Sequence, residues 1–327
     1  MLWKTLIALI VVLLLAGGAV WLFGPREPVE TTIRFDPAAI GADPDAYLAR
    51  TEADIPNLRE NAQKEIVWAY PASRARTPVS IVYVHGFSAA KGETRPLADT
   101  VAASLGANLF YTRLTGHGRD GAAMEQADVN AWLNDLAEAV AIGREIGNRV
   151  IVIGTSTGGT LATFGATQPG LMQGVAGLVL ISPNFGLLDR WAFALDLPWA
   201  RDLLPLVGGE TRGFDPLNDP QAENWTTRYP IGALVPMAAL VRETLRADIS
   251  GIALPVLTLF SPNDRIVDPA ATEAVMARWQ GPREVVEVPA SGDPASHVLA
   301  GDIVSPQTTD DLAARIVSWA EALPPTD

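Results

Sequence analysis

The sequence predicts an α/β fold: a mostly parallel, doubly wound sheet with a helical cap insertion, preceded by one N-terminal transmembrane helix. Three observations predict it. From Glu65 onward, short apolar strand candidates alternate with amphipathic helical stretches. The alternation is interrupted once, by residues 184–250, which are far more than one crossover helix requires. An uncharged apolar run, Thr5–Phe23, lies near the N-terminus. The expected organisation is a membrane anchor over residues 1–24, a spacer over residues 25–61 and a folded domain over residues 62–327.

The run Thr5–Phe23 has the length and composition of a membrane span. Its 19 residues would extend roughly 28 Å as a helix, close to the hydrocarbon thickness of a bilayer. A cleaved signal peptide is the alternative, since the small residues 16–19 could be cut. Cleavage would leave the apolar residues 20–23 at the mature end, and Trp21 suits a membrane interface. We therefore expect an uncleaved, single-pass anchor.

The charges that flank this run bear on its orientation. Lys4 favours a cytoplasmic N-terminus, whereas Arg26 and Arg34 on the other side weaken the bias. We expect the folded domain to be extracytoplasmic.

Residues 25–61 are polar, contain five prolines and carry many acids. This composition predicts a spacer between membrane and domain. Within it, Asp43-Pro44 is typical of a helix N-cap followed by proline at the first helical position. The short helix that follows could place Tyr47, Leu48 and Ile55 on the domain.

Bulk composition excludes several classes of function. A net charge of −13 argues against nucleic-acid binding, because phosphates require a basic surface. The chain has no Cys, which excludes disulfides, thiolate catalysis and Cys-based metal sites. With three His, a His-rich metal site is not expected either. We expect no metal and no cofactor.

Seven apolar runs are predicted to form the sheet. They are Glu65–Tyr70, Ser80–Val84, Asn108–Thr112, Arg149–Ile153, Gly177–Ile181, Pro255–Phe260 and Glu284–Val288. Amphipathic stretches such as Val129–Ile146, where Trp132, Leu133 and Leu136 recur at helical spacing, predict right-handed crossover helices between them.

The insertion over residues 184–250 is rich in Trp, Leu and Phe. Pro198, Pro205 and Pro230 are expected to divide it into short helices. Two interpretations stay open: a subdomain with its own small core, and a cap whose underside lines an apolar substrate pocket.

The strand candidate Val150–Ile153 continues into Gly154-Thr155-Ser156-Thr157-Gly158. The G-x-S-x-G spacing is typical of a nucleophile elbow, a sharp strand-to-helix turn that exposes the central Ser hydroxyl. Gly154 and Gly158 would be needed because a Cβ at either position would clash in such a turn. Ser156 is therefore the candidate nucleophile.

A Ser hydroxyl needs a base, and the three His are the candidates. Only His297, after the last strand candidate, gives the order Ser, acid, His expected when an elbow lies in mid-sheet. His85 and His117 follow earlier strands and are interpreted as scaffold.

The acid that orients this base should follow the strand candidate Pro255–Phe260. Asp264 comes first after that strand, whereas Asp268 precedes Pro269 and a helical run, a pattern typical of an N-cap. We assign the acid to Asp264. Asp293 and Asp302 are interpreted as loop acids.

An oxyanion hole requires backbone N–H donors. Thr157, which follows the nucleophile at the start of its helix, should supply one, and Phe87, in the loop after Ser80–Val84, the other. Gly86 would let that loop approach closely.

Five motifs together resemble the α/β-hydrolases, and more narrowly the serine hydrolases related to monoacylglycerol lipases, lysophospholipases and carboxylesterases, with a serine aminopeptidase-like hydrolase domain. The motifs are His85-Gly86-Phe87, Leu114-Thr115-Gly116-His117-Gly118, Gly154–Gly159, Asn263–Val267 and Ser296-His297. The resemblance implies a triad of Ser156, Asp264 and His297, a lid made by the insertion, and a structural role for His117. One departure is Thr115, where Pro is common in relatives.

The expected function is hydrolysis of carboxylic esters with apolar acyl groups, such as monoacylglycerols, lysophospholipids or short-acyl esters, through an acyl-enzyme. Thioester or amide cleavage on the same triad is the alternative, and a non-catalytic lipid-binding protein a further one. The partners would be a small ester substrate and the membrane. Neither acyl length nor oligomeric state is predicted.

Overall fold

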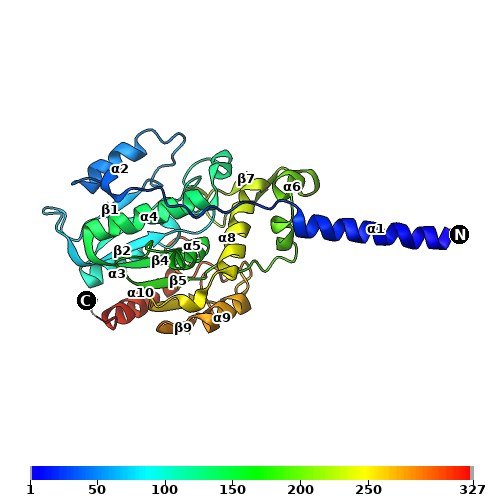
Figure 1. The fold of residues 1–327 in the computed structure, drawn as a ribbon. Helices are drawn as coiled ribbons and strands as arrows, with labels where there is room; N and C mark the ends of the chain where they lie inside the picture. The colour runs from blue at the N-terminus through cyan, green and yellow to red at the C-terminus, as the bar shows by residue number, and fades with distance from the viewer. Residues whose placement is uncertain (1, 325–327) are drawn as a thin grey trace.

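The computed structural model describes residues 2–324 and contains a seven-stranded sheet (Figure 1). The strand order is β1-β3-β2-β4-β5-β8-β9, with β1 antiparallel to β3 and the other neighbours parallel. The strands are β1 (Glu65–Val67), β2 (Thr77–Val84), β3 (Asn108–Tyr111), β4 (Gly147–Thr155), β5 (Val175–Ile181), β8 (Val256–Phe260) and β9 (Arg283–Glu287). The predicted fold class is confirmed. The predicted strand Glu65–Tyr70 ends early, at Val67, because β1 is an edge strand with a short antiparallel partner.

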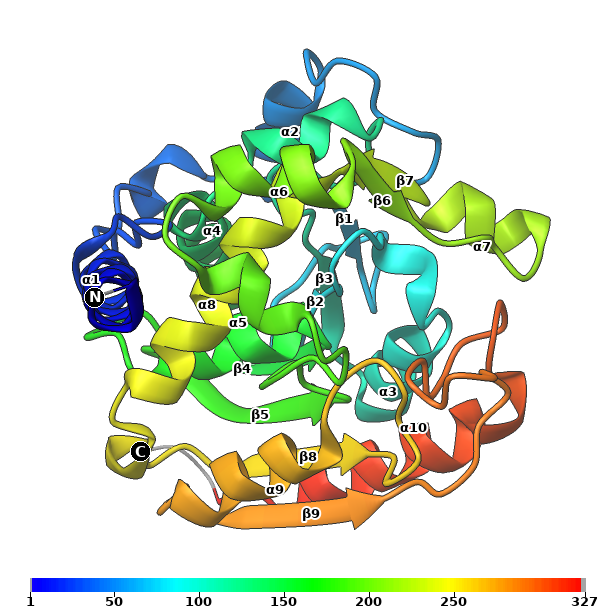
Figure 2. The ribbon, with the colours of Figure 1, turned by 90° about the vertical axis from the view of Figure 1, so that its right-hand side faces the viewer.

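Helices cover both faces of this sheet (Figure 2). Alternation along β2 sends Val82 and Val84 to one face and Ile81 and Tyr83 to the other. On the first face lie α4 (Val129–Ile146), α5 (Thr157–Ala166), α8 (Leu234–Arg246) and α9 (Pro269–Arg278). On the second face lie α3 (Leu97–Leu105) and α10 (Pro306–Glu321).

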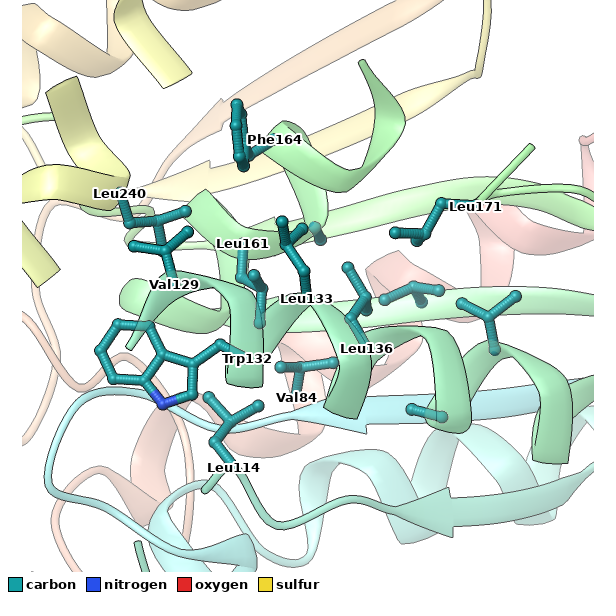
Figure 3. Packing of buried hydrophobic residues seen from close by; sticks show 14 of the residues in the cluster. Val84, Leu114, Val129, Trp132, Leu133, Leu136, Leu161, Phe164, Leu171 and Leu240 are labelled. Carbon is teal, nitrogen blue, oxygen red and sulfur yellow. The ribbon is translucent and has the colours of Figure 1, made fainter. Parts of the chain in front are cut away.

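Helix α4 has the bounds predicted from its periodicity. Asp128 caps its N-terminus by accepting a hydrogen bond from the Ala131 N–H at 2.7 Å. Trp132, Leu133 and Leu136 are fully buried against α5 and the sheet (Figure 3). The Trp132 indole also donates to the Thr115 carbonyl at 3.1 Å, which fixes a loop at the carboxyl end of β3.

Residues 184–250 form a cap made of short elements. They are η4 (Ala192–Asp196), α6 (Ala200–Gly208), β6 (Thr211–Gly213), α7 (Asp219–Asn224), β7 (Arg228–Pro230), η5 (Ile231–Ala233) and α8. Pro205 does not divide the insertion as predicted, because it lies inside α6, where it removes one hydrogen bond without ending the helix. Most buried apolar residues of the insertion belong to the main core, where α8 packs on α5, so the interpretation as a subdomain with its own small core is wrong. The interpretation as a cap whose underside lines a substrate pocket stays a prediction.

At the N-terminus, α1 (Leu2–Phe23) projects from the body as a separate rod (Figure 1). Its residues Trp3–Phe23 have a mean hydropathy of 2.8 and are not buried by the rest of the chain. By length and composition α1 fits either an anchor or a signal sequence.

Residues 25–61, predicted to be a spacer, are bonded to the surface of the domain. The Asn134 side chain accepts hydrogen bonds from the Arg34 and Phe35 N–H groups at 2.6 and 2.9 Å. Helix α2 (Pro44–Glu52), capped by Asp43 as expected, places Tyr47 and Leu48 in the main core. We call this segment the strap, because it runs along the domain surface to which it is bonded.

Candidate active site

The turn between β4 and α5 holds Ser156 in an unusual conformation. Its φ is 51° and its ψ is −116°, a region that L-residues rarely adopt. A Cβ at Gly158 would lie 2.2 Å from the Val84 carbonyl oxygen, and one at Gly154 would lie 2.7 Å from the Gly158 backbone. Only glycine fits at these two positions: Gly154 lets the end of β4 approach α5, and Gly158 lets α5 approach the end of β2.

Ser156, His297 and Asp264 lie in one hydrogen-bonded line. The His297 Nε2 is 3.1 Å from the Ser156 Oγ, and the Nδ1 is 2.8 Å from the Asp264 Oδ2. The other carboxylate oxygen of Asp264 accepts from the Ile266 and Val267 N–H groups at 2.8 and 3.0 Å. A carboxylate at Nδ1 favours the tautomer that donates there, which leaves Nε2 free to accept the Ser156 proton.

The remaining acids near this line have other partners. Asp268 caps α9 by accepting from the Ala270 N–H at 3.0 Å, as its sequence context predicts. Asp293 accepts from the His297 and Val298 N–H groups at 3.0 and 2.9 Å. Asp293 therefore fixes the backbone of the loop that carries His297. Its interpretation as a loop acid did not include this role.

His85 and His117 are both fully buried and 5.0 Å apart between ring centroids. The His85 Nδ1 donates to the Gly86 carbonyl at 2.9 Å, and its Nε2 accepts from the Leu114 N–H at 3.1 Å. Burial lowers the pKa of His85 to about 4 and that of His117 well below its usual range. Both rings are therefore neutral near pH 7 and act as fixed parts of the loops after β2 and β3.

The loop after β2 brings Gly86 and Phe87 beside the nucleophile. A Cβ at Gly86 would lie 3.2 Å from the Ser156 Cβ. The Phe87 ring makes edge-to-face contacts with His117 and with Tyr229 of β7, at centroid distances of 5.7 and 5.2 Å. This loop thus joins the cap to the sheet next to Ser156.

Glu93 is a component of the site that sequence reasoning missed. Its side chain is buried, with 3% of its surface exposed, and it accepts hydrogen bonds from the Gly86 N–H at 2.6 Å and the Tyr83 hydroxyl at 2.8 Å. The nearby Lys91 pairs with Glu65 instead, at 2.6 Å. Burial raises the pKa of the Glu93 carboxyl to about 7, although both hydrogen bonds act to lower it.

One sequence signal points to Glu93: it lies in the loop after β2, the same loop that carries Phe87. No group of three or more His, Asp or Glu side chains within residues 2–324 is placed to hold a metal ion.

Residues 81–310, more than two thirds of the chain, match the model of the alpha/beta hydrolase family. This chain belongs to the α/β hydrolases. It is 27% identical over 207 residues to the thermostable monoacylglycerol lipase of Bacillus sp. (strain H-257), an alignment that covers 63% of this chain and 79% of that enzyme. The predicted family resemblance is confirmed.

Two solved structures share the fold of this α/β hydrolase. One comes from LipS and LipT, two metagenome-derived lipolytic enzymes, with a TM-score of 0.62, 20% identity and coverage of 82% of this chain and 98% of that chain. The other is a soluble variant of the monoglyceride lipase from Saccharomyces cerevisiae in complex with a substrate analogue. Its TM-score is 0.62, with 16% identity and coverage of 84% and 96%.

Proposed function

We propose that this α/β hydrolase is a serine hydrolase that cleaves carboxylic esters of apolar acyl groups through an acyl-enzyme. The enzyme is a carboxylic ester hydrolase, and its catalytic residues are Ser156, His297 and Asp264. The observation that carries the proposal is the continuous hydrogen-bonded line from the Ser156 Oγ through His297 to Asp264. Its position at the carboxyl ends of β4 and β8 is where α/β sheets hold reacting groups.

In the first half-reaction, the His297 Nε2 takes the Ser156 proton while the Oγ attacks the ester carbonyl. The Phe87 and Thr157 N–H groups hold the negative oxygen of the tetrahedral intermediate. The C–O bond to the alcohol then breaks, and His297 gives its proton to that leaving oxygen. The product is an acyl ester on Ser156 and a free alcohol.

In the second half-reaction, His297 removes a proton from water as the water oxygen attacks the acyl carbon. The same two N–H groups hold the second tetrahedral intermediate. The bond from the acyl carbon to Ser156 then breaks, and His297 returns the proton to the Ser156 oxygen. The acid is released and the starting state is restored.

The proposed substrates are lipid-like esters such as monoacylglycerols or lysophospholipids, together with short-acyl esters. Phe87, which follows the Gly86 that lies beside the nucleophile, packs its ring against Tyr229 of the cap and supplies apolar surface for an acyl group. The similarity to a monoacylglycerol lipase supports the same substrate class. Rates on ester, thioester and amide versions of one acyl group test this, and an amide or thioester cleaved faster than its ester would contradict the assignment.

We also propose that α1 is retained as a membrane anchor with the catalytic domain outside the cytoplasm. Full exposure of its apolar surface supports burial in lipid. Mass spectrometry of the membrane-bound protein tests this, because removal of a signal sequence would leave a chain that lacks residues up to about Ala19.

The test of the nucleophile is labelling with a fluorophosphonate. The native enzyme should label, Ser156→Ala should not, and Ser104→Ala, on the exposed end of α3, should label like the native enzyme. Equal labelling of Ser156→Ala would show that another residue reacts.

A further inference from the structure

The outer surface of the cap carries a group of exposed apolar side chains. Leu206 and Val207, near the end of α6, are 80% and 83% exposed. With Leu203 they follow the i, i+3, i+4 spacing of one helix face, while Leu204 points into the core. We call the exposed side chains at helical spacing the cap apolar face, and its members are Trp199, Leu203, Leu206 and Val207.

The chain that leaves α1 is bonded to this part of the cap. The Trp199 N–H donates to the Pro25 carbonyl at 2.9 Å, and the Arg26 Nε donates to the Asp196 carbonyl at 2.9 Å. A Cβ at Gly24 would lie 2.5 Å from the Pro198 Cβ, so the two backbones are in close contact. Figure 1 shows α6 at the level of the base of α1. The cap therefore lies at the level where α1 ends.

The next residue of the strap strengthens the attachment. Glu27 pairs with Arg201 of α6, and its carbonyl accepts from the Arg242 side chain of α8 at 2.8 Å. Arg242 also pairs with Asp196 of η4. These contacts hold η4, α6 and α8 to the end of α1 as one unit, so the height of the cap above the end of α1 is fixed.

The side chains at this level are of the kind found at membrane interfaces. Arg26 stacks over Trp21 at the end of α1, and Arg190 stacks over Trp191 of the cap, at 5.3 and 5.2 Å from the ring centroids. Trp together with Arg is typical of the boundary between hydrocarbon and water, where the ring lies in the headgroups and the cation reaches phosphate.

From these contacts we propose that the cap apolar face rests in the headgroup region of the same bilayer that α1 spans. The occupant is a lipid surface, because the attachment to α1 holds the face beside the bilayer at high effective concentration, whereas a second copy would have to diffuse to it. The inference rests on the proposed anchoring by α1. In this arrangement the cap is a second membrane contact besides α1. The cap lies against the lipid bilayer, which is the source of apolar ester substrates.

Single-cysteine reporters test this, since the chain has no native Cys. Leu206→Cys reports the cap apolar face, Val12→Cys the middle of α1, and Ser104→Cys on α3 is the matched exposed control. Each full-length variant carries an environment-sensitive NBD fluorophore and is reconstituted into phosphatidylcholine vesicles with or without doxyl-labelled lipid. We expect quenching at positions 12 and 206 and none at position 104.

Each other outcome overturns the inference in a distinguishable way. Quenching at position 12 alone retains the anchor and rejects the cap contact. Quenching at neither position rejects the anchor and, with it, this inference. Disulfide-linked dimers of unlabelled Leu206→Cys in vesicles, together with no quenching of the labelled variant at position 206, would assign the face to a second copy of the chain.

A rate measurement gives an independent check. Leu206→Ser with Val207→Ser should lower hydrolysis of a long-chain monoacylglycerol embedded in vesicles several-fold. Hydrolysis of a water-soluble short-chain ester should stay unchanged, because both side chains point into solvent and take no part in the contacts that hold Ser156, His297 and Asp264. If the variant hydrolyses the vesicle-embedded monoacylglycerol as fast as the native enzyme does, the proposal is overturned.

Discussion

The carboxyl edge of the sheet and the outer face of the cap differ in how their side chains are partnered within the chain. Around Ser156, the acids have defined partners: Asp264 accepts two backbone N–H groups besides His297, and Glu93 accepts two donors. On the cap, the side chains of Leu206 and Val207 are exposed. Buried polar groups without partners destabilise a fold, whereas exposed apolar groups are tolerated where a further surface covers them. The acids of the site therefore have their partners within the chain, whereas the apolar side chains of the cap do not.

The largest effect should come from the nucleophile. Ser156→Ala should lower kcat/KM roughly 10⁴- to 10⁶-fold, with residual rate left from binding and the oxyanion donors. Initial rates on a chromogenic ester would measure it, with Ser104→Ala as the control. A loss of less than about tenfold would remove Ser156 from the mechanism.

Two acids in one loop allow a matched comparison. Asp264→Asn should lower kcat by about 10⁴-fold, because an amide no longer holds His297 in the tautomer that accepts the Ser156 proton. Asp268→Asn should leave kcat within about twofold, since Asn is an equally good N-cap for α9. Similar losses in the two variants would contradict the assignment of the acid.

Glu93 should act through the position of the Gly86–Phe87 loop. Glu93→Ala leaves the buried Gly86 N–H without its acceptor, and we expect kcat to fall about 10- to 100-fold while KM changes little. Glu93→Gln keeps an acceptor oxygen and should recover most of the rate. A KM effect without a kcat effect would place Glu93 outside the oxyanion loop.

The same carboxyl should make stability depend on pH. Burial raises its pKa from 4.5 to about 7, so the folded protein binds this proton more tightly than the unfolded chain does. The contribution is fully present below pH 4.5 and is lost as the pH rises through about 7. The difference in unfolding free energy between native enzyme and Glu93→Gln should shrink over this interval, by up to about 3 kcal/mol. Thermal unfolding in detergent at several pH values would measure it, and a constant difference would contradict it.

The smallest effect should lie in the strap, far from the chemistry. The Tyr47 hydroxyl donates to the buried Glu138 carboxylate at 2.6 Å. Tyr47→Phe should destabilise the domain by about 1 kcal/mol and leave kcat/KM unchanged. Tyr70→Phe, whose side chain is exposed, is the control and should change neither. A rate loss in Tyr47→Phe would couple the strap to catalysis.

Features of the fold and site that depend on neighbouring residues in the sequence could be predicted, whereas those that depend on contacts between distant segments could not. The seven strands, the bounds of α4 and the Asp43 and Asp268 caps come from local patterns, and the sequence predicted them within a few residues. The candidates Ser156, Asp264 and His297 could be proposed because strand ends of a parallel sheet meet at one edge. Local patterns do not show how distant segments dock.

For that reason the contacts of residues 24–35 and the surroundings of Glu93 were missed. Polar composition predicted a spacer over residues 25–61 and a short helix that could place Tyr47 on the domain, yet Arg34 and Phe35 also bond to Asn134, 100 and 99 positions away. Glu93 receives its burial from β2, β4 and the Gly86 loop together, which its position in the loop after β2 does not indicate.

The bonds between residues 24–27 and the cap also determine how the enzyme can move. A domain on a flexible tether turns freely above its membrane, but here the chain is bound from its first residues after α1. If α1 is retained as the proposed anchor, domain and helix should rotate as one body, at the slow rate that lipid viscosity imposes on α1. Such an enzyme would keep one side towards the lipid through many turnovers, and lipid-like substrates would reach it by lateral diffusion in the bilayer.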